Sequence, residues 1–230
     1  MGQPTPFFYL SIRMDDRTMA TETISLTGVL LAGGKSRRMG RDKRFLELNG
    51  RTLLDRAVSV FESLFEEVLI VVAEPTPKLG GLRHRVVTDL IPGRAALGGL
   101  HAGLSYAAWP KVFAAACDMP FLSQPVIRRM VELAPHADAV IAQLTDGLQP
   151  MHAVYSKGCL PYLERMAKSG RLRLQDLCRE PGLSVRLVSE EELRGVDPQF
   201  LSFMNINTPA DLEFARKLLA DEPLRRESGD

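Results

Sequence analysis

The sequence predicts an α/β protein, a Rossmann-like three-layer sandwich with a mostly parallel, partly mixed central sheet. Apolar runs of strand length alternate with stretches of helical spacing, the pattern that parallel strands and their connecting helices produce. Several of these runs end in glycine or aspartate, at Gly33-Gly34, Asp89 and Asp118. The composition, 45% hydrophobic and 25% charged, is that of a globular protein.

The expected strands are short and almost continuously apolar, as in sheets that are covered on both faces. They span residues 26–31, 68–73, 85–88, 111–117, 137–142, 151–155 and 185–188.

Helical spacing of apolar residues predicts the covering helices. One runs from Thr52 to Phe65, with Thr52 and Asp55 as a capping pair. Two more are expected within 97–109 and 125–133. A last helix should begin at Thr208-Pro209, since threonine caps a helix and proline suits its first position.

The 230 residues fit one large domain or two small ones. No repeat, low-complexity segment or linker divides the body of the chain. We therefore expect one domain over 26–220, a loose N-terminal extension over 1–25 and a charged tail over 221–230.

The charge balance argues against a nucleic-acid or membrane partner. The 29 basic and 28 acidic residues leave a net charge of +1. The three cysteines, an odd number without a Cys-x-x-Cys pair, favour neither a disulfide framework nor a zinc site. No apolar run approaches the ~18 residues that would span a bilayer, so we expect a cytoplasmic protein.

The segment 30–43 predicts an anion site, because ligands of open α/β sheets bind beyond the carboxyl ends of the strands. It holds three glycines and five cations after a strand. Glycine lets backbone N–H groups approach phosphate oxygens, and the cations offset the charge. A nucleoside triphosphate is the natural ligand, and a basic surface turn is the alternative.

Gly34-Lys35-Ser36 also resembles the end of an ATPase or kinase phosphate loop, with Asp118 as its magnesium ligand. That motif requires a glycine five positions before Gly34, where this chain has Val29. Because the anion nest depends on a turn of fixed length, the spacing disfavours this interpretation.

The loop Leu31-Ala32-Gly33-Gly34, Ser36, Arg38-Met39-Gly40 and Asp42-Lys43 resembles the signature of the MobA-like nucleotidyltransferases, the family of molybdenum cofactor guanylyltransferase. Further family pieces follow in order over about 27–219: Asp89, Leu97-Gly98-Gly99, Cys117-Asp118-Met119-Pro120-Phe121, Gln149-Pro150-Met151-His152-Ala153-Val154-Tyr155 and Asn205-Ile206-Asn207-Thr208-Pro209. Two positions depart from the usual pattern: Ala95-Ala96 replaces Gly-Pro, and Val72 replaces the asparagine of some members.

The resemblance implies transfer of GMP from GTP to the terminal phosphate of molybdopterin, with release of pyrophosphate. It implies Mg²⁺ as cofactor, for which Mn²⁺ can substitute. It also implies protein partners that deliver the molybdenum cofactor or take part in the maturation of molybdoenzymes. The opening loop and the Asp-Met-Pro-Phe piece are shared with cytidylyl-transferring relatives, so a cytidylyltransferase or another nucleotidyltransferase of this fold stays an alternative. A non-catalytic GTP-binding adaptor is the alternative from another class.

The resemblance also implies roles for single residues. Nucleotide contacts are expected from Leu31, Ala32, Gly33, Gly34, Asp89, Lys43 and Asp118. Lys43, Arg38 and Asp118 are the expected catalytic residues, with Asp118 on the metal. Pterin contacts are expected from Asn205, Asn207 and His152. The alternatives are purely structural roles: Asp89 and Asp118 could cap turns or helices, and His152 could lie in the core.

Overall fold

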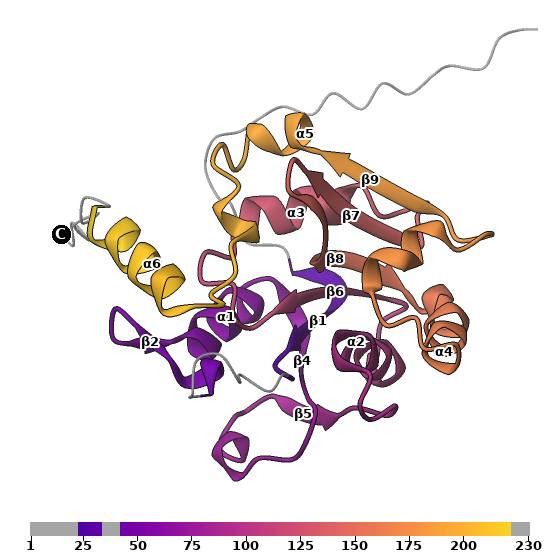
Figure 1. Cartoon of the computed structure of the whole chain (residues 1–230), viewed down its shortest axis with the longest axis horizontal. Coiled ribbons are helices and arrows are strands. Elements are labelled where there is room, and N and C mark those ends of the chain that lie inside the picture. The colour runs from indigo at the N-terminus through magenta and orange to yellow at the C-terminus, as the bar shows by residue number, and fades with distance from the viewer. Residues whose placement is uncertain (1–22, 34–41, 222–230) are drawn as a thin grey trace, which may run out of the picture.

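The computed structural model describes residues 23–33 and 42–221 (Figure 1). A central sheet of seven strands has the order β5-β4-β1-β6-β8-β7-β9. Its strands are β1 (Ile24–Leu31), β4 (Phe65–Val72), β5 (Arg85–Thr88), β6 (Lys111–Ala116), β7 (Ala139–Leu144), β8 (Gly147–Ser156) and β9 (Val185–Ser189). All neighbours pair in parallel except β8, which is antiparallel to both β6 and β7. The predicted mostly parallel, partly mixed sheet is confirmed.

Helices cover both faces of the sheet and make the three expected layers. On one face α1 (Leu53–Glu62), α3 (Gln124–Glu132) and α5 (Glu190–Arg194) enclose one apolar core. On the other face α2 (Ala95–Tyr106) and α4 (Leu160–Lys168) enclose a second. The remaining short helices are η1 (Lys43–Phe45), η2 (Pro77–Leu79), η3 (Lys157–Cys159), η4 (Leu174–Arg179) and η5 (Leu201–Phe203).

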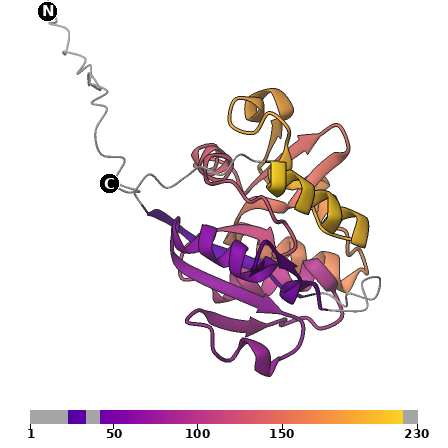
Figure 2. The ribbon, with the colours of Figure 1, turned by 90° about the vertical axis from the view of Figure 1, so that its left-hand side faces the viewer.

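Helix α6 (Pro209–Asp221) stands out from the body beside the small hairpin of β2 (Glu47–Leu48) and β3 (Arg51–Thr52), as Figures 1 and 2 show. Leu212 and Ala215 of α6 pack against Leu48, Leu53 and Ile206 in a third, smaller core. This contact fixes the C-terminal helix next to the segment that precedes α1.

Helix α1 begins as predicted and ends earlier. The Thr52 hydroxyl accepts a hydrogen bond from the backbone N–H of Asp55 at 3.1 Å, which confirms the capping pair. The helix stops at Glu62, and Phe65 already belongs to β4, where it pairs with Ile24. The prediction of a helix through Phe65 was therefore wrong, because helix and strand follow one another without an intervening glycine or proline.

Strand β1 begins at Ile24, inside the segment predicted as an N-terminal extension. The rest of that extension and nearly all of the predicted tail lie outside the described residues. Within the described ranges no helix is long and apolar enough to cross a membrane.

Candidate nucleotide and acceptor site

Four neighbouring parallel strands bring their carboxyl ends to one edge of the sheet. Backbone hydrogen bonds continue past the strand ends, from Ala32 N to Val71 O (2.8 Å), from Asp89 N to Val72 O (3.1 Å) and from Cys117 N to Leu31 O (3.2 Å). The residues that follow β1, β5 and β6 therefore share this edge, as the topology predicted. We call this edge, with the groups that gather there, the carboxyl edge.

Three side chains from distant parts of the chain meet at the carboxyl edge. The Lys43 ammonium lies 3.2 Å from Asp118 Oδ2 and donates a hydrogen bond to Asn207 Oδ1 at 2.9 Å. The side chains of Lys43 and Asp118 are 16% and 21% exposed, so both are partly shielded and still reachable from solvent. A partly shielded ion pair with an amide beside it is suited to a charged, hydrogen-bonding ligand.

Lys43 begins the one-turn helix η1, whose start is fixed by its neighbours. Asp42 caps this helix by accepting a hydrogen bond from the backbone N–H of Arg44 at 3.2 Å. The Arg44 guanidinium returns to the same carboxylate, with Nε 2.9 Å from Oδ1 and Nη2 2.6 Å from Oδ2. Its hydrogen bond to Asp42 raises the pKa of Arg44. Sequence reasoning gave Asp42 no structural role and missed Arg44, although an aspartate before a short helix is the usual capping signal.

Asn207 reaches Lys43 because the chain crosses back over the end of β6. The backbone N–H of Ile206 donates to the carbonyl of Asp118 at 2.9 Å, and the Ile206 side chain is fully buried. Asp211 then accepts from the N–H groups of Asn207 (2.8 Å) and Thr208 (2.7 Å), which lowers the pKa of its carboxyl. The predicted start of α6 thus also fixes the backbone of Asn207.

Asn205 lies two residues before Asn207 on the same segment and is partly exposed. Its Nδ2 donates to the carbonyl of Phe203 at 3.2 Å. Through its place in the chain, between Phe203 and Asn207, Asn205 lies near the pair Lys43–Asp118.

Asp89 follows β5 and lies against the first turns of α2. A Cβ at Gly98 would be 3.2 Å from Asp89 Oδ2 and 2.9 Å from Ile91 O, so glycine permits this close approach. Burial raises the pKa of the Asp89 carboxyl. Helix α2 begins at Ala95 with φ 49°, in the left-handed region that favours glycine. Alanine therefore adopts, in this chain, a backbone conformation that glycine adopts more easily.

The structure describes some of the other residues that were predicted to bind the nucleotide or its phosphates. Leu31 and Ala32 are 6% and 4% exposed, so their side chains are buried in the core. Gly33 is exposed, and a Cβ there would lie 3.1 Å from the backbone nitrogen of Ala73. Gly34 and Arg38 lie outside the described residues.

His152 is the predicted pterin residue that the structure does not bring to the carboxyl edge. Its side chain is fully buried, with the ring centroid 5.1 Å from Phe113 and 4.6 Å from Phe203. Nδ1 lies 3.0 Å from the carbonyl oxygen of Ser202, and burial lowers the pKa to about 4. The prediction that His152 contacts a pterin is therefore corrected: His152 is a core residue of β8.

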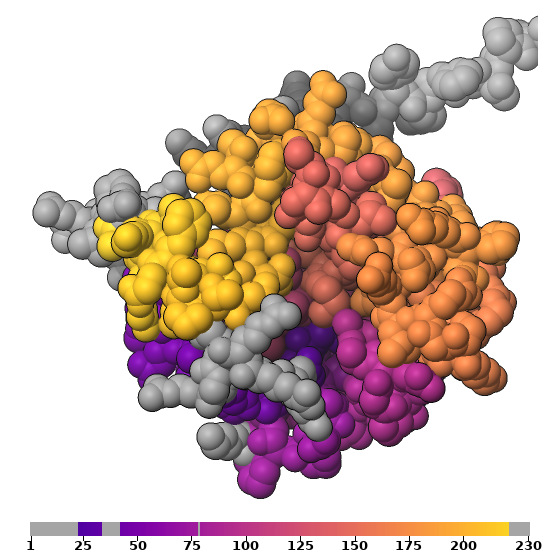
Figure 3. Space-filling model, viewed as in Figure 1, coloured from indigo at the N-terminus to yellow at the C-terminus, as the bar shows by residue number. Residues whose placement is uncertain are grey.

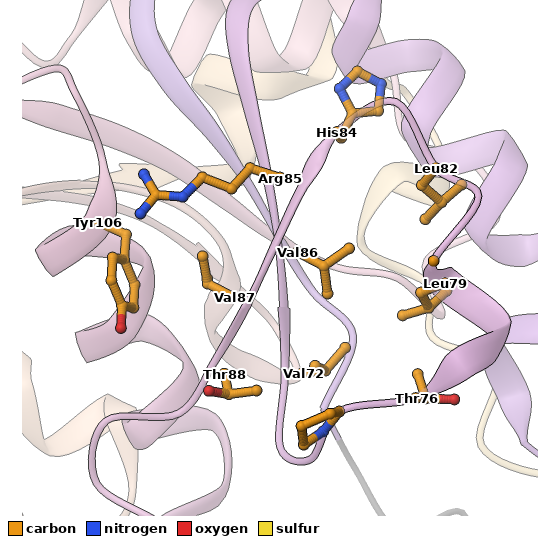
Figure 4. A pocket seen from close by; sticks show the side chains of 12 residues that line it. Val72, Thr76, Leu79, Leu82, His84, Arg85, Val86, Val87, Thr88 and Tyr106 are labelled. Atoms are coloured by element: carbon orange, nitrogen blue, oxygen red, sulfur yellow. The ribbon is translucent and has the colours of Figure 1, made fainter.

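Figure 3 shows a recess between the C-terminal segment (yellow) and α2 (magenta), with the amino-terminal part of the chain (indigo) deeper inside it. A separate cavity of about 620 Å³ runs along the edge strand β5 (Figure 4). It reaches Val72 and Thr88, the last residues of β4 and β5, and Arg85 stacks over Tyr106 at 5.0 Å. This cavity therefore extends to the same sheet edge as Asp89.

The donors at the carboxyl edge fit a cation that is held mainly by its substrate. Among the described residues no group of three or more His, Cys, Asp or Glu side chains could enclose a metal ion. Asp118 offers a single carboxylate that solvent can reach. Mg²⁺ is commonly held by one or two carboxylates together with water and phosphate oxygens, so this donor set suits it.

A glycine after the first strand, with a lysine, a carboxylate and an amide gathered at the carboxyl ends of parallel strands, defines a nucleotide-binding α/β protein. A family model described as MobA-like NTP transferase domain matches residues 28–184. The chain belongs to the MobA-like nucleotidyltransferase family, and this confirms the family suggested by the sequence motifs.

Relatives support this membership over most of the chain. The molybdenum cofactor guanylyltransferase of Desulfosudis oleivorans is 41% identical over 83% of this chain and 94% of its own length. A probable molybdenum cofactor guanylyltransferase of Pelotomaculum thermopropionicum is 40% identical over 84% and 93%. The crystal structure of molybdopterin-guanine dinucleotide biosynthesis protein A from Archaeoglobus fulgidus superposes with a TM-score of 0.76, at 27% identity, covering 85% of this chain and 99% of that one.

Proposed function

We propose that this chain transfers GMP from GTP to the terminal phosphate of molybdopterin, releases pyrophosphate and forms the guanine dinucleotide cofactor. The observation that carries the proposal is the meeting of Lys43, Asp118 and Asn207 at the carboxyl edge. Relatives at 41% and 40% identity that are named for this reaction support the same conclusion.

The reaction is a displacement at the α-phosphorus of GTP. An oxygen of the terminal molybdopterin phosphate forms a new bond to that phosphorus, while the bond to the oxygen bridging the α- and β-phosphates breaks. The electron pair leaves with pyrophosphate. No covalent enzyme intermediate is needed, so the protein has to align two anionic reactants and offset their charge.

Lys43 is the group that offsets this charge on the described part of the chain. Its ammonium is held at 3.2 Å from Asp118 and 2.9 Å from Asn207, and η1 orients its backbone. From this position it binds phosphate oxygens as a point charge and stabilises the negative charge that develops on pyrophosphate. By resemblance, Arg38 adds a second cation to the same phosphates.

Asp118 is the residue that would hold Mg²⁺. The bound cation would neutralise charge on the phosphate oxygens, and Mn²⁺ is a chemically similar substitute. The carboxylate also fixes Lys43, since the two are 3.2 Å apart. Asp118 therefore serves both the cation and the ammonium group that act on the phosphates.

The two substrates are assigned to different residues of the carboxyl edge. The backbone at Leu31, Ala32 and Gly33, the carboxylate of Asp89 and, by resemblance, Gly34 would bind the nucleotide. Asn205 and Asn207 would bind the acceptor, because amides both donate and accept hydrogen bonds and can pair with a pterin. The proposal places the enzyme in the cytoplasm with proteins that deliver the cofactor or receive the product.

The full chain, incubated with molybdenum-loaded molybdopterin, Mg²⁺ and one nucleoside triphosphate at a time, tests this proposal. We expect pyrophosphate release with GTP and a much slower release with CTP, ATP or UTP. Release with CTP alone would identify a cytidylyltransferase. GTP binding without pyrophosphate release in the presence of acceptor would identify a non-catalytic adaptor.

A further inference from the structure

The buried imidazole of His152 lies beneath the segment that carries Asn205 and Asn207. The ring is fully buried, and its Nδ1 lies 3.0 Å from the carbonyl oxygen of Ser202 in η5. The lowered pKa keeps the ring neutral near neutral pH, and because a carbonyl oxygen can only accept, Nδ1 carries the ring's proton and donates a hydrogen bond to Ser202 O. Phe203, the next residue, packs on the same ring.

A second buried group holds the same turn through its N–H groups. The Asp197 carboxylate accepts from the N–H groups of Leu201 (3.1 Å) and Ser202 (2.9 Å). The peptide groups around Ser202 are thus held through both their donor and their acceptor, by two side chains that are each more than nine-tenths buried. Further along, Ile206 N donates to Asp118 O, so the segment 202–206 is anchored at both ends.

The chemistry of His152 argues that this anchor is more than packing. Nε2 of His152 has no hydrogen-bond partner within the described residues, and neither has Oγ of Ser202. A buried polar atom left without a partner destabilises a fold, and an aromatic hydrocarbon would fill the space between Phe113 and Phe203 without that cost. What only the imidazole supplies is the hydrogen bond to Ser202.

We propose that His152 is a positioning residue, whose hydrogen bond to the Ser202 carbonyl sets the 202–207 segment and through it Asn205 and Asn207. The effect on acceptor binding rests on the proposed function, whereas the effect on the segment does not. The chain of contacts runs from β8 through His152 to Ser202, along the backbone to Ile206 and Asn207, and from Asn207 to Lys43.

Three variants of the full chain test the proposal. His152→Phe keeps an aromatic ring and removes the donor, whereas His152→Asn keeps a donor at a position close to that of Nδ1. Tyr155→Phe is the matched control, because it removes another buried hydrogen bond of β8, from the Tyr155 hydroxyl to Pro150 O (2.7 Å), on the opposite face of the sheet. Each variant is first compared with the wild type for its overall unfolding midpoint.

The first readout is amide hydrogen exchange of residues 202–207 without substrates. In His152→Phe we expect exchange in this segment to be about tenfold faster than in the wild type, with exchange in the sheet unchanged, because one buried hydrogen bond is lost locally. His152→Asn should restore most of the protection, and Tyr155→Phe should leave it unchanged. Unchanged exchange in His152→Phe, or an increase spread evenly over the whole sheet, would overturn the proposal.

The second readout is steady-state kinetics. We expect KM for molybdopterin to rise about tenfold in His152→Phe and KM for GTP to change by less than about twofold, since the displaced amides face the acceptor. If KM for molybdopterin and KM for GTP rise by the same factor in His152→Phe, and His152→Asn restores neither, the role of His152 is purely structural. If the wild type transfers no nucleotide at all, the proposed function fails, while the exchange result still decides whether His152 positions the segment.

Discussion

At the scale of single residues, the charge of Asp118 has the most direct consequence for turnover. Asp118→Asn removes the carboxylate beside Lys43 while keeping the shape of the side chain. We expect kcat to fall about 10²-fold or more, because the phosphates lose the group that would hold their cation. Pyrophosphate release under saturating GTP measures this. Glu66→Gln, an exposed change at the start of β4, is the control, and a near-normal rate in Asp118→Asn would remove Asp118 from the metal role.

Lys43 makes a separate prediction about nucleotide binding. Lys43→Ala should weaken GTP binding by about tenfold, the effect of losing one charge-assisted contact to phosphate. Titration calorimetry with GTP and Mg²⁺ measures the affinity directly. Lys168→Ala, on the exposed end of α4, is the matched loss of one positive charge and should bind GTP like the wild type. Equal affinities in wild type and Lys43→Ala would show that the ammonium does not contact the phosphates.

The sequence could predict that Gly33, Asp89 and Asp118 share an edge, since the carboxyl ends of parallel strands lie together, whereas the place of Lys43 came from the family resemblance. Motif resemblance added Asn207, which no local pattern places there. His152 was assigned to the wrong environment for a physical reason. Strands covered on both faces are apolar at nearly every position, so the two-residue alternation that reveals a side chain's direction is lost. Nothing in the local pattern distinguishes an inward imidazole from one that faces a ligand.

At the scale of elements, the contact of α2 with β1 depends on Gly103. A Cβ at this position would lie 2.6 Å from Val29 Cγ1, far inside van der Waals contact. Gly103→Ala should therefore lower the free energy of unfolding by about 1–3 kcal/mol, the usual cost of overpacking a core. Urea denaturation measures the loss.

Gly195→Ala is the matched control for this experiment. Gly195 ends α5 with φ −69°, a conformation that alanine adopts easily, and a Cβ there would meet no atom within 4 Å. We expect this variant to change the free energy of unfolding by less than about 1 kcal/mol. An equal loss in both variants would contradict the close approach of α2 to β1.

The order and type of most elements were predictable, and some of their boundaries were not. Thr52 with Asp55, and Thr208 with Pro209, mark helix starts by capping chemistry that depends only on neighbouring residues. The end of α1 was misplaced because Ser63-Leu64 makes a turn without glycine or proline. Sequence reasoning missed α4, although a proline near its start and the buried Leu163, Met166 and Ala167 carry a helical pattern.

At the scale of the whole molecule, the buried His152 makes stability depend on pH. Its pKa is lowered by burial from 6.5 to about 4, so between these values the unfolded chain binds a proton that the folded chain does not. The free energy of unfolding therefore keeps its full value above about pH 6.5. It falls by about 3 kcal/mol, from this group alone, as the pH is lowered to 4. Urea unfolding at intervals from pH 7 to pH 4 measures this slope.

His152→Phe provides the comparison, because it cannot bind this proton. Its unfolding free energy should change less over the same pH window than that of the wild type. Parallel pH profiles for the two proteins would contradict the neutral, buried state of His152.

The strand order of the sheet lay beyond sequence reasoning. The alternation of strands and helices predicts a mostly parallel sheet, but β8 enters between β6 and β7 and runs antiparallel to both. The pairing of β7 with β8 is a local hairpin, closed by the turn at Thr145-Asp146, whereas the pairing of β6 with β8 joins strands that are about 30 residues apart and leaves no local signal. This arrangement brings His152 of β8 next to Phe113 of β6 and under η5.

The position of the radiolabel that passes from GTP to molybdopterin tests the central claim most directly. With label on the α-phosphate, we expect the label in the guanine dinucleotide cofactor. With label on the γ-phosphate, we expect all of it in pyrophosphate. Transfer of the γ-label to the acceptor, or its release as orthophosphate, would identify a kinase or a GTPase and would contradict nucleotidyl transfer at the carboxyl edge.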